Sequence, residues 1–391
     1  MAIGLITDEG SVFVEVESTE GVYVEEQAGG SAIEVLSDGL EFTPTKELLE
    51  RNNRTSTVEK VAGRVGQKSM AGTVPVEFKA AENSGQPPET APLWQALLGG
   101  VRSVVGRVSG TTHTTTRINL AAGEGAQYTV GDIVRIREYD LDSNNPDHVS
   151  FVSGTDDDWV DLGIPYHQNF SDGVEVSDST IFFHQGDAPT LSITNYIGGE
   201  IREKAIGMRP VSCEISNFST GQLSQASFSL EGLDFDREDG SPIFAPAYDN
   251  SLPPVTLCAK VFRDDVEYVL NSVTINMANT LGFLTSTASC SGKISSRITE
   301  FVTTFTLNPY MDDSQLTEFD AFVQNAPYGV FGSAHNQGGN ENQHLNNVAF
   351  YMPNCRTNEL TTGDEDGIVT DAISGQAYKL NGNDTIFIAF I

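Results

Sequence analysis

The clearest pattern in the chain is an alternating stretch, followed by a proline-containing loop and a short apolar stripe. Apolar and polar positions alternate up to residue 78, which predicts a strand with one buried face; the apolar side chains are Met70, Val74, Val76 and Phe78. Pro92 stands where a first helical residue is expected, and Gly99 follows where a helix ends. The stripe between them predicts a helix that packs on the sheet through Trp94, Leu97 and Leu98.

The same order recurs between residues 294 and 323. A second alternating run predicts a strand, with Phe301, Thr303, Phe305 and Leu307 on one face. A second apolar stripe after it predicts a helix, and Phe319 and Phe322 are expected to pack this helix on its sheet. One strand, loop and helix unit used twice indicates a tandem duplication. Two runs near residues 211–216 and 226–232 predict antiparallel strands with one wet face.

Shifts in composition divide the chain into four parts. A first β domain is expected at residues 1–107 and 169–240, interrupted by a small inserted β domain at 108–168. An acidic, proline-rich linker at 241–254 precedes a second β domain at 255–391. The expected fold class is therefore mainly β, with two tandem β-sandwich or barrel domains, a short helix flanking each, and the insert. The length suits two or three domains.

Residues 43–62 form a long charged stretch without strand periodicity. In a compact domain, a loop of this length is usually functional or intermolecular. Its charged side chains are therefore candidates for contacts with a partner: Glu47, Glu50, Arg51, Arg54, Glu59 and Lys60.

Charge and composition narrow the possible functions. The 391 residues include 54 acidic and 22 basic residues, which give a formal net charge of −32. A field of this sign opposes nonspecific binding to nucleic acid or to an anionic membrane. No apolar run approaches the roughly 18 residues of a membrane span, and the N-terminus lacks the pattern of a secretory signal. The four cysteines are far apart, as expected for reduced core residues.

The search for chemistry gives no strong motif, so no cofactor, metal or catalytic residue is expected. Asp140-Leu141-Asp142 begins like a calcium loop, but the required glycine and terminal glutamate are missing. His335 and His344 bracket one loop, which is a weak signal for a metal. No nucleophile elbow and no phosphate-binding loop with its lysine occurs. A structural role is favoured.

Between residues 39 and 100 the chain resembles the tail tube (major tail) proteins of long, noncontractile-tailed bacteriophages. Four pieces in the family's order carry this resemblance: Leu48-Leu49-Glu50-Arg51, Gly72 to Phe78, Ala91 to Leu98 and, later, Ala226 to Gly232. The insert and the second copy depart from the family's single-copy pattern.

The resemblance implies a nonenzymatic virion subunit that assembles in the host cytoplasm. Its β-sandwiches would join into rings of six units, so three duplicated chains would form a pseudo-hexameric ring. Rings would stack around a tape-measure protein and later conduct DNA without binding it, between tail terminator and tail tip proteins. The charged loop, with Glu47, Glu50, Arg51, Arg54, Glu59 and Lys60, would reach the next ring.

Three alternatives stay open. A tail terminator or baseplate protein of the same fold would form single rings instead of stacks. A capsid-decorating adhesin would use the insert to bind a glycan. An acidic β-sandwich hydrolase would need a cleft with two convergent carboxyl groups and a perturbed pKa.

Overall fold

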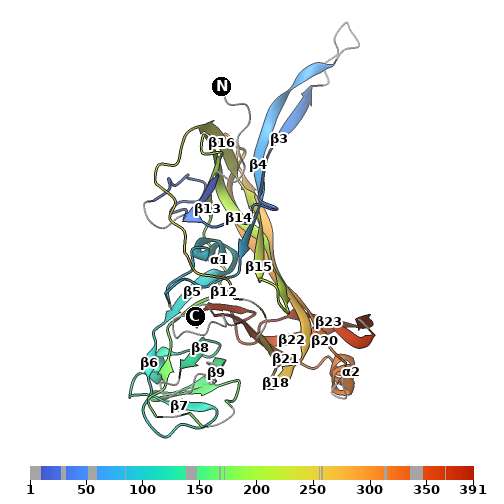
Figure 1. Ribbon diagram of the computed structural model, residues 1–391. Helices are drawn as coiled ribbons and strands as arrows, with labels where there is room; N and C mark the ends of the chain where they lie inside the picture. Colours follow the sequence, from blue (N-terminus) through green and yellow to red (C-terminus); the bar gives the residue numbers. More distant parts are fainter. Residues whose placement is uncertain are drawn as a thin grey trace.

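The computed structural model describes residues 10–391 except for short gaps at 28–31, 52–59, 84, 138–147, 167–168, 171, 255, 257–258, 312–314, 335–346 and 366. Among these residues, two α-helices accompany a large set of strands. The prediction of a mainly β fold is therefore confirmed. Figure 1 shows a layered body, a long hairpin arm at one end and a separate small β unit at the other.

One continuous sheet of eight strands runs through the body. Its neighbours are joined in antiparallel fashion in the order β3-β4-β15-β14-β19-β20-β23-β22. The strands are β3 (Glu41–Arg51), β4 (Val61–Glu77), β14 (Ile201–Ser219), β15 (Gln225–Gly232), β19 (Leu270–Thr285), β20 (Lys293–Pro309), β22 (Val348–Glu365) and β23 (Ile368–Ala377). Alternating side chains give this sheet one buried face and one wet face, as the periodicity predicts.

The longest strand of each half, β14 in the first and β22 in the second, continues from this sheet into a further sheet. The first part of β14 pairs with β13 (Leu191–Ile197) and β16 (Asp234–Asp239). The first part of β22 pairs with β21 (Tyr328–Ala334) and β24 (Phe387–Phe390). These sheets are completed by β1 (Ser11–Val16), β2 (Ala32–Ile33), β17 (Lys260–Arg263) and β18 (Val266–Tyr268). The main apolar core lies between the layers.

The two halves of the chain repeat one topology. In the first half, the pairs are β1–β2, β1–β13, β13–β14, β14–β15, β14–β16, β4–β15 and β3–β4. Their counterparts are β17–β18, β17–β21, β21–β22, β22–β23, β22–β24, β20–β23 and β19–β20. Each half also carries one helix at the equivalent place. Helix α1 (Ala91–Leu98) follows β4 in the first half, and α2 (Gln315–Gln324) follows β20 in the second. β14 and β19 then join the halves edge to edge.

The inserted segment is larger than its predicted limits. β5 (Gly99–Val104) and β12 (Ser179–His184) pair with each other and have no counterpart among the described residues of the second half. Between them, a separate six-stranded sheet runs β6-β11-β8-β9-β10-β7. Its strands are β6 (Arg107–Val108), β7 (Arg117–Asn119), β8 (Ile133–Arg137), β9 (His148–Thr155), β10 (Trp159–Leu162) and β11 (Glu175–Val176), and a 3-10 turn spans Gly125–Gln127. Because β11 closes the sheet between β6 and β8, the sheet ends at Val176 and not at residue 168.

The insert is fixed to the second half of the chain. β12 pairs with β24, which extends the second-half sheet by the paired strands β12 and β5. The ring of Phe151 in the insert stacks on Tyr351 of β22 at 3.8 Å between centroids and also meets Phe331 of β21. Aromatic contacts of this kind give the small sheet a defined orientation on the body.

The charged stretch at residues 43–62 is not a loop over its described length. β3 and β4 form a hairpin that projects from the body as an arm, defined here as residues 41–69 (Figure 1). The loop prediction was wrong because almost every side chain of β3 is exposed, so the strand has no buried face to produce alternation.

Candidate assembly surfaces

The arm is a two-stranded ribbon with apolar side chains open to solvent. Leu48, Leu49 and Val65 are between about half and two thirds exposed. At its base, the amide of Lys68 donates to the carbonyl of Ser291, 3.0 Å away, in the turn between β19 and β20. The second-half hairpin therefore supports the first-half arm.

The predicted contact residues are placed as follows. Glu47, Glu50 and Arg51 lie on β3, and Lys60 directly precedes β4; all four are exposed. Lys60 Nζ lies 3.8 Å from Glu50 Oε1 across the hairpin, with both side chains largely in solvent, so this pair contributes little to stability. Arg54 and Glu59 lie outside the described residues. The assignment of these side chains to contacts between rings stays a prediction.

The charge of the arm is opposite to that of the molecule. Residues 41–69 contain six basic and four acidic side chains, in a chain with 22 basic and 54 acidic residues. A mildly basic, partly apolar ribbon on an acidic protein is suited to an acidic protein surface, including that of another copy.

The eight-stranded sheet ends in two edges that are open along part of their length. Among the described residues, β3 pairs with β4 alone, and the second part of β22 pairs with β23 alone. An edge strand exposes unpaired backbone groups and can template pairing with another chain. The sequence patterns did not predict these edges. The duplication could have indicated the edge of β22, because β22 is the counterpart of β14 and β14 uses the corresponding edge to pair with β19.

The wet face of the sheet is lined with small polar side chains. One row crosses six neighbouring strands, each residue paired with the next: Ser227, Glu214, Asn276, Thr304, Gln376 and Arg356. The adjacent row on the other face is buried and mostly apolar: Ala226, Ile215, Ile275, Phe305, Gly375 and Thr357. The sheet thus presents a hydroxyl-rich and amide-rich surface with one glutamate and one arginine in this row.

The two helices differ in how far they are packed. Trp94, Leu97 and Leu98 on α1 are at most 1% exposed, and the Trp94 ring meets Phe78, Phe228 and Phe390 at 5.7, 4.9 and 5.8 Å. On α2, Phe322 is half-buried, but Phe319 is 58% exposed. The expectation that Phe319 packs on its own sheet is wrong for the single chain, because α2 lies on β22 at the sheet margin and not between layers (Figure 1).

Convergent carboxylates occur in the first half, around a buried lysine. Lys79 Nζ lies 2.5 Å from Glu34, 3.8 Å from Glu77 and 3.9 Å from Glu89. Burial raises the pKa of Glu77 and of Glu89, against the opposing effect of Lys79. Lys79 also donates to the carbonyls of Asp249 and Ser251 in the predicted linker. The cluster therefore attaches residues 249–251 to the first half, which is a structural use of its charges.

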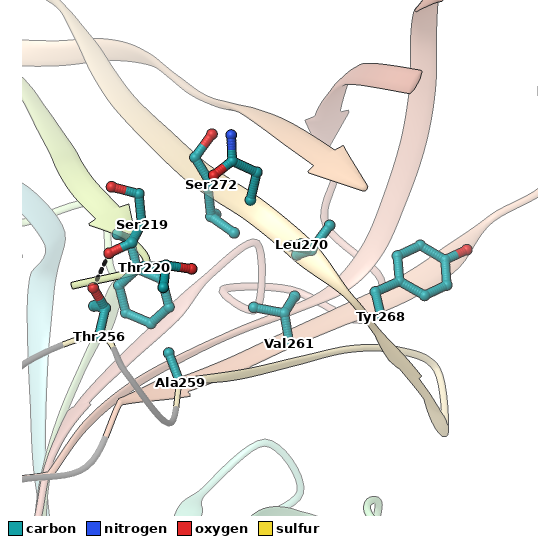
Figure 2. Close-up of a pocket in the computed structure, with 11 residues that line it drawn as sticks. Ser219, Thr220, Thr256, Ala259, Val261, Tyr268, Leu270 and Ser272 are labelled. Carbon is teal, nitrogen blue, oxygen red and sulfur yellow. Dashed lines mark hydrogen bonds between the residues drawn. The ribbon is translucent and has the colours of Figure 1, made fainter. Parts of the chain in front are cut away.

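A small cavity elsewhere in the chain does not contain these groups. It has a volume of about 80 Å³ and lies at the end of β14, beside β17 and β19 (Figure 2). Hydroxyl groups and small apolar side chains line it, among them Ser219, Thr256, Val261 and Ser272, and the Thr256 hydroxyl donates to the Ser219 carbonyl. Its lining has no pair of carboxyl groups of the kind that glycoside hydrolysis requires.

Metal and membrane sites receive no support from the part of the chain that the structure describes. Within it, no cluster of three or more histidine, cysteine, aspartate or glutamate side chains could hold a metal ion. The calcium-like segment from Asp140 and both His335 and His344 lie outside the described residues. No helix in the described ranges is long and apolar enough to cross a membrane.

Glu20 connects the two halves near the arm base. Its carboxylate accepts hydrogen bonds from the Ser296 amide at 2.5 Å, the Ser295 hydroxyl at 2.8 Å and Arg297 at 2.9 Å. It also lies 3.7 Å from the buried Arg209 of β14. Burial raises the pKa of Glu20, but the hydrogen bonds and Arg209 outweigh it and hold the pKa below its usual value.

The replacement Glu20→Gln is expected to destabilise the chain by about 1–2 kcal/mol at pH 7. A lowered folded-state pKa gives stability that is complete above the unfolded value, near 4.3, and is lost as pH falls through the folded value. The difference from the natural chain should therefore shrink in acid, as measured by urea unfolding between pH 7 and 3. Glu50→Gln in the exposed pair is the control and should change little at any pH. An equal loss at pH 7 and pH 3 would contradict this role.

Taken together, these features define a β-structural protein whose distinctive surfaces are strand edges, an arm and an exposed helix face. A comparison with protein-family models gives a match to "Phage tail tube protein" over residues 7–377. The chain belongs to this family, and it is a structural component of the phage tail. A search of curated proteins finds no match.

Proposed function

We propose that this tail tube protein forms rings by repeating, between chains, the edge-to-edge junction that joins its own two halves. The observation that carries the proposal is the β14–β19 pairing, which unites two units of equal topology and leaves β3 and β22 open. Since β22 is the counterpart of β14, and β3 of β19, β22 of one copy would pair with β3 of the next. The junction is antiparallel and also apolar, with Ile215 against Ile275.

Closure of this arrangement would remove both edges. Three chains of eight sheet strands would give a barrel of 24 strands and six units, the pseudo-hexameric ring expected for a duplicated subunit. Barrels of 16–18 strands already enclose a water-filled channel, so a barrel of this size would leave a wide lumen. Closed barrels also avoid the aggregation to which open edges are prone.

The wet face of the eight-stranded sheet would line the channel. Serine, threonine, asparagine and glutamine side chains contact water without offering positive charge. DNA binds to proteins chiefly when lysine and arginine replace its counterions. A lining with Glu214 and a single arginine in its central row, on a chain of net charge −32, would therefore let DNA pass without retaining it.

The arm would connect successive rings. It extends beyond the body, exposes leucine and valine side chains, and is mildly basic, whereas the rest of the chain is strongly acidic. A contact between one end of a subunit and the other end of the next is heterologous and does not close, so it generates a filament. The insert would decorate the outside of the tube. Tape-measure, terminator and tail tip proteins would be further partners.

Negative-stain electron microscopy of the purified chain at rising protein and salt concentrations tests this proposal. Salt screens the self-repulsion of a strongly acidic subunit and should favour assembly. Long hollow tubes with threefold or pseudo-sixfold symmetry are expected. Single closed rings would instead support a terminator or baseplate role, and a chain that stays monomeric throughout would contradict self-assembly.

A further inference from the structure

Helix α2 exposes two apolar side chains and buries an acidic one, against the usual arrangement of a surface helix. Its buried acidic residue, Glu318, is only 5% exposed and pairs with Arg263 and with the hydroxyl of Tyr268. Phe319 and Val323 on the same helix are 58% and 65% exposed. Since the Glu318 contacts hold the helix in this orientation, the exposed phenylalanine and valine are a built feature of the fold. Exposed apolar side chains that are held in place in this way mark a surface that a partner covers.

In the counterpart helix α1, the equivalent apolar side chains are covered by other parts of the chain. Trp94, Leu97 and Leu98 have the same spacing as Phe319, Phe322 and Val323 and follow the equivalent strand. Part of the cover over α1 comes from the other half of the chain. Phe390 of β24 meets the Trp94 ring, and Asn279 of β19 donates to the carbonyl of Leu97, 3.0 Å away.

The position of α2 indicates which surface would cover it. α1 packs on β14, the strand at whose edge the second half of the chain docks. α2 packs on β22, the counterpart of β14, and the second part of β22 has an open edge. The exposed face of α2 is therefore continuous with the edge at which, by the β14–β19 template, the first half of another unit would dock.

We infer that Phe319 and Val323 are covered, within the ring, by the first half of a second copy of this chain that pairs with β22. The inference rests on the proposed function, because it assumes ring formation through that edge. It goes beyond edge pairing by assigning the helix face to the lateral interface and not to the contact between rings. Burial of these apolar side chains would stabilise the lateral interface only when the second copy pairs with β22 in the correct register. Helix α2 would therefore help to determine this register.

The double substitution F319D/V323D tests this inference. Carboxylates at these positions would have to be buried unpaired in the lateral interface, whereas they are solvated in the free chain. We expect the variant to remain monomeric in sedimentation velocity and electron microscopy under conditions where the natural chain forms tubes. Its circular dichroism and thermal unfolding should match those of the natural chain. F319L/V323L, which keeps both side chains apolar, should assemble.

A control is Val130→Asp, which introduces one carboxylate at a 58% exposed valine of the insert and should leave assembly unchanged. Normal tubes formed by F319D/V323D would overturn the inference while the proposed function stands. Closed rings that no longer stack would overturn it too, because the helix face would then belong to the contact between rings. If the natural chain forms no ring or tube, the proposed function fails and the inference fails with it.

Discussion

Replacing Trp94 with alanine is expected to destabilise the folded chain by about 3–5 kcal/mol. The indole is 1% exposed and meets Phe78, Phe228 and Phe390, which come from both halves of the chain. Its removal leaves a large cavity that close-packed neighbours fill only in part. Urea unfolding followed by circular dichroism measures the loss, since the far-ultraviolet signal comes mainly from the backbone and is retained without the indole.

Phe319→Ala is the matched comparison, because Phe319 holds the same position on α2. With 58% of the side chain already in solvent, the free chain should lose no more than about 0.5 kcal/mol. If Trp94→Ala and Phe319→Ala were equally costly in the monomer, α2 would be packed on the chain itself and the contrast between the helices would be wrong.

This contrast also separates what sequence periodicity can predict from what it cannot. Local patterns correctly placed α1, because proline at its start, glycine at its end and the apolar stripe all lie within ten residues of one another. Gly99 has a φ of 87°, a left-handed conformation that suits the end of a helix. The same apolar spacing in α2 could not reveal exposure, which depends on whether strands distant in sequence cover the helix.

The arm and the insert boundary were missed for related reasons. A ribbon that is wet on both faces carries no alternation, so β3 could be found only from its backbone pairing with β4. β11 has two residues and belongs to the small sheet through its partners β6 and β8, not through its own pattern. The open edge of β22 is likewise a relation between strands. The duplication, in contrast, was visible because whole units repeat in order.

Replacing residues 47–67 of the arm with an Asn-Gly turn is expected to abolish tube growth while leaving a folded subunit. Lys46 and Lys68 face each other across β3 and β4, so a two-residue turn between them closes the hairpin in the existing register. The turn between β19 and β20 still supports Lys68 through Ser291. The removed segment contains Leu48, Leu49 and Val65, whose burial against the next ring would supply the apolar part of the contact.

The shortened chain should form closed rings by electron microscopy, because the edges of β3 and β22 that the ring needs lie largely below the deletion. Its unfolding free energy should stay within about 1 kcal/mol of the natural value, since the removed side chains are mostly exposed. Val130→Asp in the insert, with the arm intact, should still give tubes. Tubes of normal length from the shortened chain would show that stacking does not depend on the arm. Loss of rings as well as tubes would place the arm in the lateral contact. The assignment of the arm to stacking alone would then be wrong.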